Sequence, residues 1–142
     1  MPLPQVGGGY QFTDGNVNEQ QVFPQGAPAA KTGATVSLTA ADLNTGLITI
    51  NGGTAGAVTA TLPTVAQLEA VISNARVDMA FDFYVVNIST VAAEDATIST
   101  ATGWTLVGNM FVASNAATTD VSSAKFRARK TGVGTWSLYR AA

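Results

Sequence analysis

The sequence predicts a mainly-β protein, and three observations carry that prediction. The composition leans towards Ala, Thr, Gly, Val and Ser; Thr and Val favour pleated strands, and Gly and Ser favour tight turns. Short alternating segments recur at roughly 8–12 residues, a spacing typical of a β-sandwich or β-barrel. One segment alone has a convincing helical pattern. The length of 142 residues suits one domain, with or without an appended segment.

Residues 1–33 are predicted to form an extended arm that precedes a β-sandwich domain at residues 34–142. This stretch contains four of the five prolines and a run of three glycines, residues that oppose regular packed elements. Fully extended, it could reach up to about 100 Å. Apolar side chains in the arm are expected to contact the domain or a neighbouring chain. These anchors are Tyr10, Phe12, Val22 and Phe23.

Two helical segments are predicted from their capping residues. Thr39 can cap a single turn, Asp42 can complete a capping box, and Gly46 can end the turn. The longer helix is predicted over residues 64–75, where Thr64 is the N-cap and Gln67 can complete a capping box. Apolar residues, Ile72 and Ala75 among them, recur there at helical spacing and mark one face.

The strongest predicted strand is Met79–Ile88. Alternation places Met79, Phe81, Phe83 and Val85 on the core face, and Asp82 and Tyr84 on the other face. A glycine-rich turn at residues 132–134 should join the last two strands as a hairpin. The other predicted strands are residues 34–38, 47–50, 57–62, 96–100, 104–108, 110–114, 123–131 and 135–141.

The residue types that are missing exclude several kinds of chemistry. Without cysteine, neither a disulfide nor a thiolate metal site can form, and without histidine the usual general base is missing. The net charge of −2 gives no general attraction to nucleic acid or to an anionic membrane. The sequence begins without a signal-peptide pattern, and no apolar run approaches the roughly 20 residues that span a bilayer. We therefore expect neither enzymatic activity nor a cofactor.

The glycine run near the N-terminus raises three alternatives: a phosphate loop, a calcium loop or a flexible arm. Gly7–Gly9 precede no predicted helix whose amides could meet a phosphate. Asp14, Asn16 and Asn18 match the first three oxygen ligands of an EF-hand loop, but Glu19 stands where that loop needs glycine. A hinge followed by an Asp-Gly turn, without a metal, is the preferred interpretation.

Three further polar groups have simple interpretations. Asp78 and Asp82 lie four residues apart on the predicted strand, about 13 Å along the backbone, which is too far for the carboxylate pair of a glycosidase. The Asn87–Ser89 stretch matches a glycosylation acceptor, but we interpret it as the end of a strand. Glu94 and Asp95 are expected to be solvated in a loop.

Three cations alternate along the penultimate strand and therefore share one face: Lys125, Arg127 and Arg129. One interpretation is a solvated face. The other is a contact between subunits or with a capsid, in which acidic residues such as Asp82 face the cations across a symmetric interface. Nucleic-acid binding is not favoured, because no aromatic residues share this face.

Five segments carry a resemblance to a known family. In order they give a capped turn, a Leu-Pro-Thr helix, a Phe-x-Phe strand that ends in Asn, and a Gly-rich hairpin that closes on Trp and Tyr. Over residues 34–142 the chain resembles virion proteins of tailed bacteriophages, in particular small capsid decoration (cement) proteins. The segments are "VSLTAADLNTGLITINGG", "ATLPTVAQLEAVI", "FDFYVVNIST", "TGWTLVGN" and "FRARKTGVGTWSLYRAA".

This resemblance implies a jelly-roll-like antiparallel sandwich or barrel that forms a homotrimer. Such a protein would sit on the capsid exterior of the virion, bind the major capsid protein and stabilise the shell by bridging neighbouring capsomers. The alternative is a receptor-binding or tail-fibre head domain that recognises a host glycan or protein. That alternative predicts a pocket lined by exposed aromatic residues such as Trp104 and Tyr84.

Overall fold

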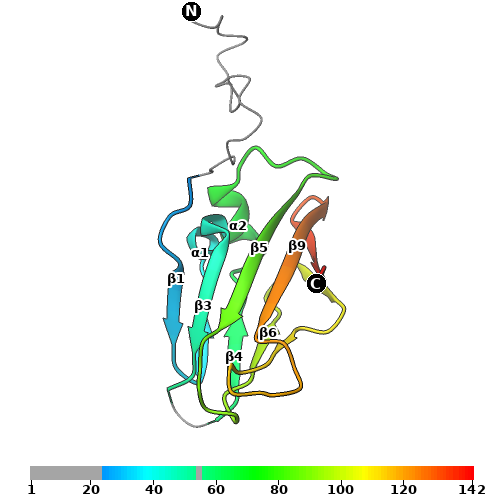
Figure 1. Ribbon diagram of the computed structural model, residues 1–142. Helices are drawn as coiled ribbons and strands as arrows, with labels where there is room; N and C mark the ends of the chain where they lie inside the picture. The colour runs from blue at the N-terminus through cyan, green and yellow to red at the C-terminus, as the bar shows by residue number, and fades with distance from the viewer. Residues whose placement is uncertain (1–23, 54–55) are drawn as a thin grey trace, which may run out of the picture.

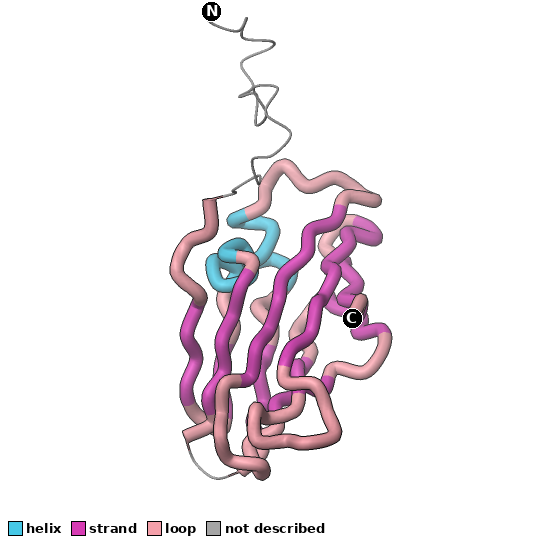
Figure 2. Tube along the Cα trace, viewed as in Figure 1, coloured by secondary structure: helices cyan, strands magenta, loops and turns pink. Residues whose placement is uncertain are grey.

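The computed structural model describes residues 24–53 and 56–142, and it confirms that this part of the chain is mainly β. Two short helices accompany the strands (Figures 1 and 2). The helices are α1 (Ala40–Thr45) and α2 (Val65–Val71). The strands are β1 (Ala29–Thr32), β2 (Thr35–Ser37), β3 (Leu47–Asn51), β4 (Val58–Thr61), β5 (Ala80–Asn87), β6 (Ala96–Ser99), β7 (Trp104–Val107), β8 (Phe111–Val112), β9 (Ser123–Gly132) and β10 (Thr135–Arg140).

The strands form two sheets. The six-stranded sheet has the order β1-β3-β5-β9-β10-β7, and the four-stranded sheet has the order β2-β4-β6-β8. The first six strands alternate between the sheets, so each pass of the chain adds one strand to each of them. Helices α1 and α2 lie in the connections that return the chain to the six-stranded sheet, at one end of the molecule (Figure 1).

The pairing direction differs from the expected antiparallel sandwich. Among the described residues, five strand pairs are parallel, and three are antiparallel. The expectation of a fully antiparallel arrangement is therefore wrong. Alternation along a strand reports which face is buried, and it carries no information on the direction of the neighbouring strand. The predicted hairpin between β9 and β10 is confirmed.

The parallel strands of the four-stranded sheet repeat one short pattern in register. Three consecutive residues of each of β2, β4 and β6 align across the sheet; the first and third of them bear a hydroxyl group, and the middle one is apolar and buried. The connections between these three strands differ in length, and each contains a helix and a strand of the six-stranded sheet, so the repeat is not evident in the sequence. The aligned rows are Thr35, Thr59 and Thr97; then Val36, Ala60 and Ile98; then Ser37, Thr61 and Ser99.

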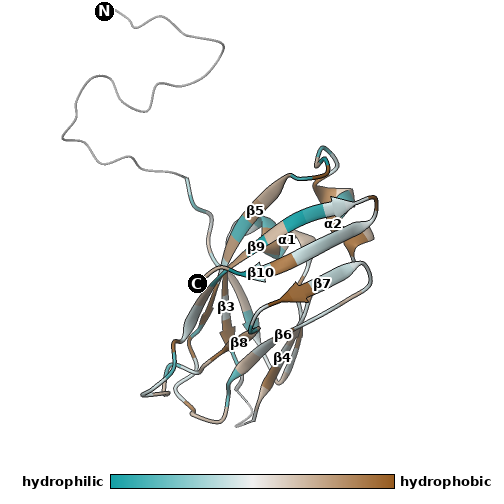
Figure 3. Ribbon diagram, turned by 90° about the vertical axis from the view of Figure 1, so that its right-hand side faces the viewer, coloured by the Kyte–Doolittle hydropathy of each residue, from teal (hydrophilic) through white to brown (hydrophobic). Residues whose placement is uncertain are grey.

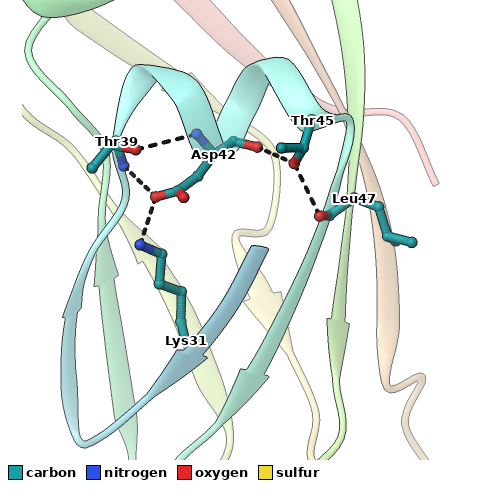
Figure 4. A network of polar contacts seen from close by, with 5 residues as sticks. All are labelled: Lys31, Thr39, Asp42, Thr45 and Leu47. Carbon is teal, nitrogen blue, oxygen red and sulfur yellow. Dashed lines mark hydrogen bonds and ion pairs between the residues drawn. The ribbon is translucent and has the colours of Figure 1, made fainter. Parts of the chain in front are cut away.

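Both predicted capping boxes are present. In α1 the Asp42 amide donates to Thr39 Oγ1 at 3.2 Å, and the Thr39 amide donates to Asp42 Oδ2 at 2.7 Å (Figure 4). Lys31 on β1 adds an ion pair to Asp42 at 2.7 Å, so the cap also ties the helix to the edge of the sheet. Thr64 and Gln67 form the equivalent box in α2. Helix α2 ends at Val71, earlier than the predicted end at residue 75.

Aromatic rings fill the core between the sheets. Phe83 and Phe126 are fully buried and stack with their ring centroids 5.6 Å apart. Phe81 meets the ring of Trp136 edge-on at 5.8 Å. Phe83 and Val85 face the core as predicted, and Phe81 is partly buried against it. Met79 does not face the core as predicted, and it is 50% exposed. It precedes β5, which begins at Ala80, so the alternation of inward and outward side chains along the strand does not extend to it.

The boundary between the predicted arm and the domain needs a correction. Residues 29–32, which the sequence analysis placed in the arm, form β1 and pair in parallel with β3. Ala29 lies opposite Ile48, and Lys31 lies opposite Ile50. Both isoleucines are fully buried, so β1 helps to close the core of the sandwich. The anchors Tyr10, Phe12, Val22 and Phe23 lie outside the described residues.

Candidate functional site

The most distinctive surface is a charged stripe on the outer face of the six-stranded sheet. We define it by Asp78, Asp82, Lys125, Arg127 and Arg129. Antiparallel pairing of β5 with β9 sets Asp82 opposite Arg127, and the strand pleat keeps the three cations on one face. Figure 3 shows hydrophilic stretches along these two strands. The sequence predicted this shared face correctly.

The stripe is held together by ion pairs within one chain. Arg127 binds Asp82 with both Nε and Nη2, at 2.7 and 2.8 Å. Lys125 Nζ lies 3.1 Å from the same carboxylate, and Arg129 pairs with Asp78. The hydrogen bonds from Arg127 hold the pKa of Asp82 well below its usual range; partial burial opposes this, and Lys125 reinforces it.

These contacts bear on the two interpretations of the cations, a solvated face or a contact between subunits or with a capsid. The interface interpretation placed acidic residues such as Asp82 opposite the cations across a subunit boundary. In the structure, Asp82 pairs with Lys125 and Arg127 of its own chain, from the neighbouring strand. The stripe nevertheless keeps an excess of one positive charge, from three cations and two carboxylates. The side chains of Arg127 and Arg129 remain 54% and 42% exposed, so both guanidinium groups can still reach a partner.

The charge of Asp82 should make stability depend on pH. Because the folded protein lowers the pKa of Asp82, its contribution is complete above about pH 4 and is lost as the pH falls towards the folded pKa. Asp82→Asn should therefore lower the free energy of unfolding by about 0.5–1 kcal/mol at pH 7, and the difference should shrink towards pH 2. Chemical denaturation at a series of pH values measures this.

Asp78→Asn is the matched control for that prediction. The Asp78 side chain is 71% exposed, and its backbone has a φ of 72°, which Asn tolerates well. We expect its stability to stay within about 0.5 kcal/mol of the parent at every pH. A deficit in Asp82→Asn that is the same at pH 2 and pH 7 would contradict an electrostatic role for Asp82.

A second feature is an apolar groove at the end of the sandwich where the helices lie. It has a volume of about 220 Å³ and forms where α1, the segment after α2, the start of β5 and β10 meet. Ile72 and Ala75 were predicted on the apolar face of the longer helix, but the groove joins elements far apart in the sequence and was not predicted. Its lining residues are Leu43, Asn44, Ile72, Asn74, Ala75, Met79, Ala80, Phe81, Asp82 and Trp136.

A buried polar network ties two loops together at the bottom of β5. Asn87 is fully buried, and its side-chain amide donates to the carbonyl oxygens of Glu94 at 2.8 Å and Val112 at 3.3 Å. The Glu94 carboxylate accepts from the hydroxyl of Ser89 and from the amide of Gly53 at 2.9 Å. Glu94 is 1% exposed, so the expectation that it is solvated is wrong. The interpretation of Asn87 and Ser89 as the end of a strand is confirmed.

Other sequence expectations fall on residues that the structure separates or does not describe. Trp104 is buried and donates from Nε1 to the Pro63 carbonyl at 2.7 Å, whereas Tyr84 is 48% exposed on the outer sheet face. They do not line a common pocket. Asp14, Asn16 and Asn18 lie outside the described residues. Within the described ranges, no group of three or more acidic side chains could hold a metal ion, and no helix has the length and apolarity to cross a membrane.

Fold and surface together define a mainly-β sandwich with a mixed six-stranded sheet whose outer face is charged and exposed. Comparisons of the chain with protein-family models, with curated proteins and with solved structures found no match.

Proposed function

We propose that the protein is a structural virion protein that binds the outer surface of a bacteriophage capsid and stabilises the shell by bridging neighbouring capsomers. The sequence resemblance over residues 34–142 suggests this role. The structural observation that supports it is the exposed outer face of the six-stranded sheet. Tyr84, Arg127 and Arg129 project there, and Tyr and Arg are the residue types that most often anchor protein interfaces.

The proposal uses the mainly-β sandwich and not a jelly roll. A jelly roll is built from antiparallel pairs, whereas the first three strands of each sheet here pair in parallel. A flat sheet face can serve as a contact surface in either topology. The function therefore depends on the side chains that the face presents, and the connection of its strands is secondary.

A homotrimer fits the proposed role and the charge of the stripe. A cyclic trimer brings unlike patches together, so the excess positive charge of one subunit can meet an acidic surface of the next. The internal pairing of Asp82 limits the charge left for that contact. Most of the association energy must then come from apolar burial, since each exposed ion pair contributes only about 0.2–1 kcal/mol. Native mass spectrometry of the isolated protein measures the assembly state.

Capsids that have been purified away from tails provide the test of location. Mass spectrometry should detect the protein on the capsids, and Tyr84→Ala together with Arg127→Ala should reduce its retention. Thr59→Ala, an exposed change on the four-stranded sheet, is the matched control and should be retained normally. Detection on tails alone would reject the capsid role and favour the receptor-binding alternative.

Two N-terminal deletions separate the predicted arm from the fold. Removing residues 2–23 should leave a domain that melts cooperatively but is retained poorly on capsids. Removing residues 2–32 also deletes β1 and uncovers the edge beside Ile48 and Ile50, so its melting temperature should be clearly lower. Circular dichroism measures both. An unfolded 2–23 deletion would place that segment in the core and contradict the assignment of a binding arm.

A further inference from the structure

The apolar groove has the size and lining to hold one aromatic side chain. Its volume is about 220 Å³, and a dry cavity of about 150 Å³ lined by apolar side chains is enough to bind benzene. Phe81 and Trp136 form part of its wall with their rings in edge contact. Met79 lines the groove and is 50% exposed, so half of this apolar residue is in contact with water unless another group fills the groove.

The described chain begins beside this groove. The side-chain amide of Gln25 donates to the carbonyl oxygen of Thr45 at 2.8 Å. Thr45 is the last residue of α1 and directly follows Asn44, which lines the groove. Figure 1 shows the first described residues at the end of the sandwich where the two helices lie. The Gln25 contact therefore fixes the point from which the preceding residues depart.

The sequence places a suitable side chain just before that point. Phe23 precedes Gln25 by two residues, so their Cα atoms are at most about 7.6 Å apart. Gln20 and Gln21 are polar and would leave the groove without apolar contact. Tyr10 and Phe12 are more than ten residues away, so ordering them against the same groove would restrict a much longer segment.

We propose that Phe23 places its ring in the apolar groove of its own chain and anchors the root of the N-terminal segment there. Contact with Met79 and Phe81, beside the buried ring of Trp136, would bury apolar surface that is otherwise partly open to water. The anchor gives the remaining arm a defined starting direction and leaves Tyr10 and Phe12 available for a neighbouring protein. This contact within one chain does not depend on the proposed capsid role.

Methyl NMR spectroscopy of the full chain tests the proposal. The methyl groups of Met79 and Ala75 both line the groove, and a docked ring would displace their chemical shifts. Phe23→Leu keeps an apolar side chain but removes the ring, so both signals should move. Phe12→Leu is the matched control and should move neither. Met110 is buried in the core and provides an internal reference in the same spectra.

The outcomes separate the possible occupants of the groove. Met79 and Ala75 signals that are identical in the parent and Phe23→Leu would overturn the proposal. Signals that respond to Phe12→Leu instead would assign the groove to a different part of the arm and also overturn it. A response to Phe23→Leu that disappears on dilution would place the ring of a second copy there. A response independent of concentration supports docking within one chain.

Discussion

Gly103→Ala is expected to destabilise the fold strongly. Gly103 has a φ of 93°, and a Cβ there would lie 2.7 Å from the Cβ of Val65 and 2.8 Å from the carbonyl oxygen of Gly134. The Gly103 carbonyl also accepts the Trp136 amide at 2.9 Å, so the backbone cannot move away freely. Backbone strain of about 1–2 kcal/mol adds to about 1–3 kcal/mol for overpacking. Chemical denaturation should therefore show a loss of about 2–5 kcal/mol in the free energy of unfolding.

Gly134→Ala separates the two contributions. Gly134 also has a positive φ, of 65°, but a Cβ there would meet no atom within 4 Å. Its cost should be limited to the backbone term of about 1–2 kcal/mol. Equal losses in the two variants would mean that α2 adjusts at Val65 without a penalty. That result would contradict the close approach of α2 to the turn before β7.

Local signals in the sequence predicted most of the elements. Each capping box needs only residues three positions apart, and Thr39 with Asp42 and Thr64 with Gln67 form as expected. The hairpin at residues 132–134 follows from its own glycines. The core position of Phe83 follows from alternation within one strand. Such features depend on backbone geometry over a few residues, which the sequence specifies directly.

Features that depend on pairs distant in the sequence were not predicted. The parallel pairing of β3 with β5 depends on the connection through β4 and α2. The residues of the two strands do not indicate whether the strands run parallel or antiparallel. The burial of Glu94 depends on Gly52, because a Cβ at that position would come within 2.5 Å of the Glu94 carboxyl carbon. A charged residue in a loop is usually solvated, so only the fold reveals this exception.

The candidate surfaces show the same division. Alternation located Lys125, Arg127 and Arg129 on one face, because that placement is a property of one strand. Their pairing with Asp78 and Asp82 required the register between β5 and β9. The apolar groove required four separate elements to meet. No sequence pattern could therefore predict the groove. The sequence does identify Phe23, the residue proposed to fill it, as an apolar anchor of the arm.

Asn87→Asp should convert the buried network into a pH-dependent weakness. The Asn87 amide nitrogen points at two carbonyl oxygens, and its Oδ1 accepts the Ser89 amide at 3.1 Å. Asp has nearly the same shape, but its charged form would place an oxygen against those carbonyls in a fully buried site. Burial and the two facing carbonyl oxygens raise the pKa of the new carboxyl group, and the single hydrogen bond from the Ser89 amide opposes this only in part, so the folded protein favours the protonated form.

The sign of the effect follows from that shift. Below about pH 3 the new carboxyl is protonated in both states, and its hydroxyl can still donate to one carbonyl, so the variant should be only slightly less stable than the parent. As the pH rises the unfolded state releases the proton first, and stability falls by about 1.4 kcal/mol per pH unit up to the folded pKa. A shift of about three units gives a loss of about 4 kcal/mol at pH 7, measured by denaturation at each pH.

Asn109→Asp is the matched control, because Asn109 is exposed and only accepts a hydrogen bond, from the Phe111 amide at 3.0 Å. A carboxylate can accept that bond equally well, so no loss should develop between pH 4 and pH 7. If the free energy of unfolding of Asn87→Asp, relative to the parent, likewise does not change between pH 4 and pH 7, water must reach the new carboxylate. The closed network around Asn87 would then open readily, and its role in fixing the two loops would be disproved.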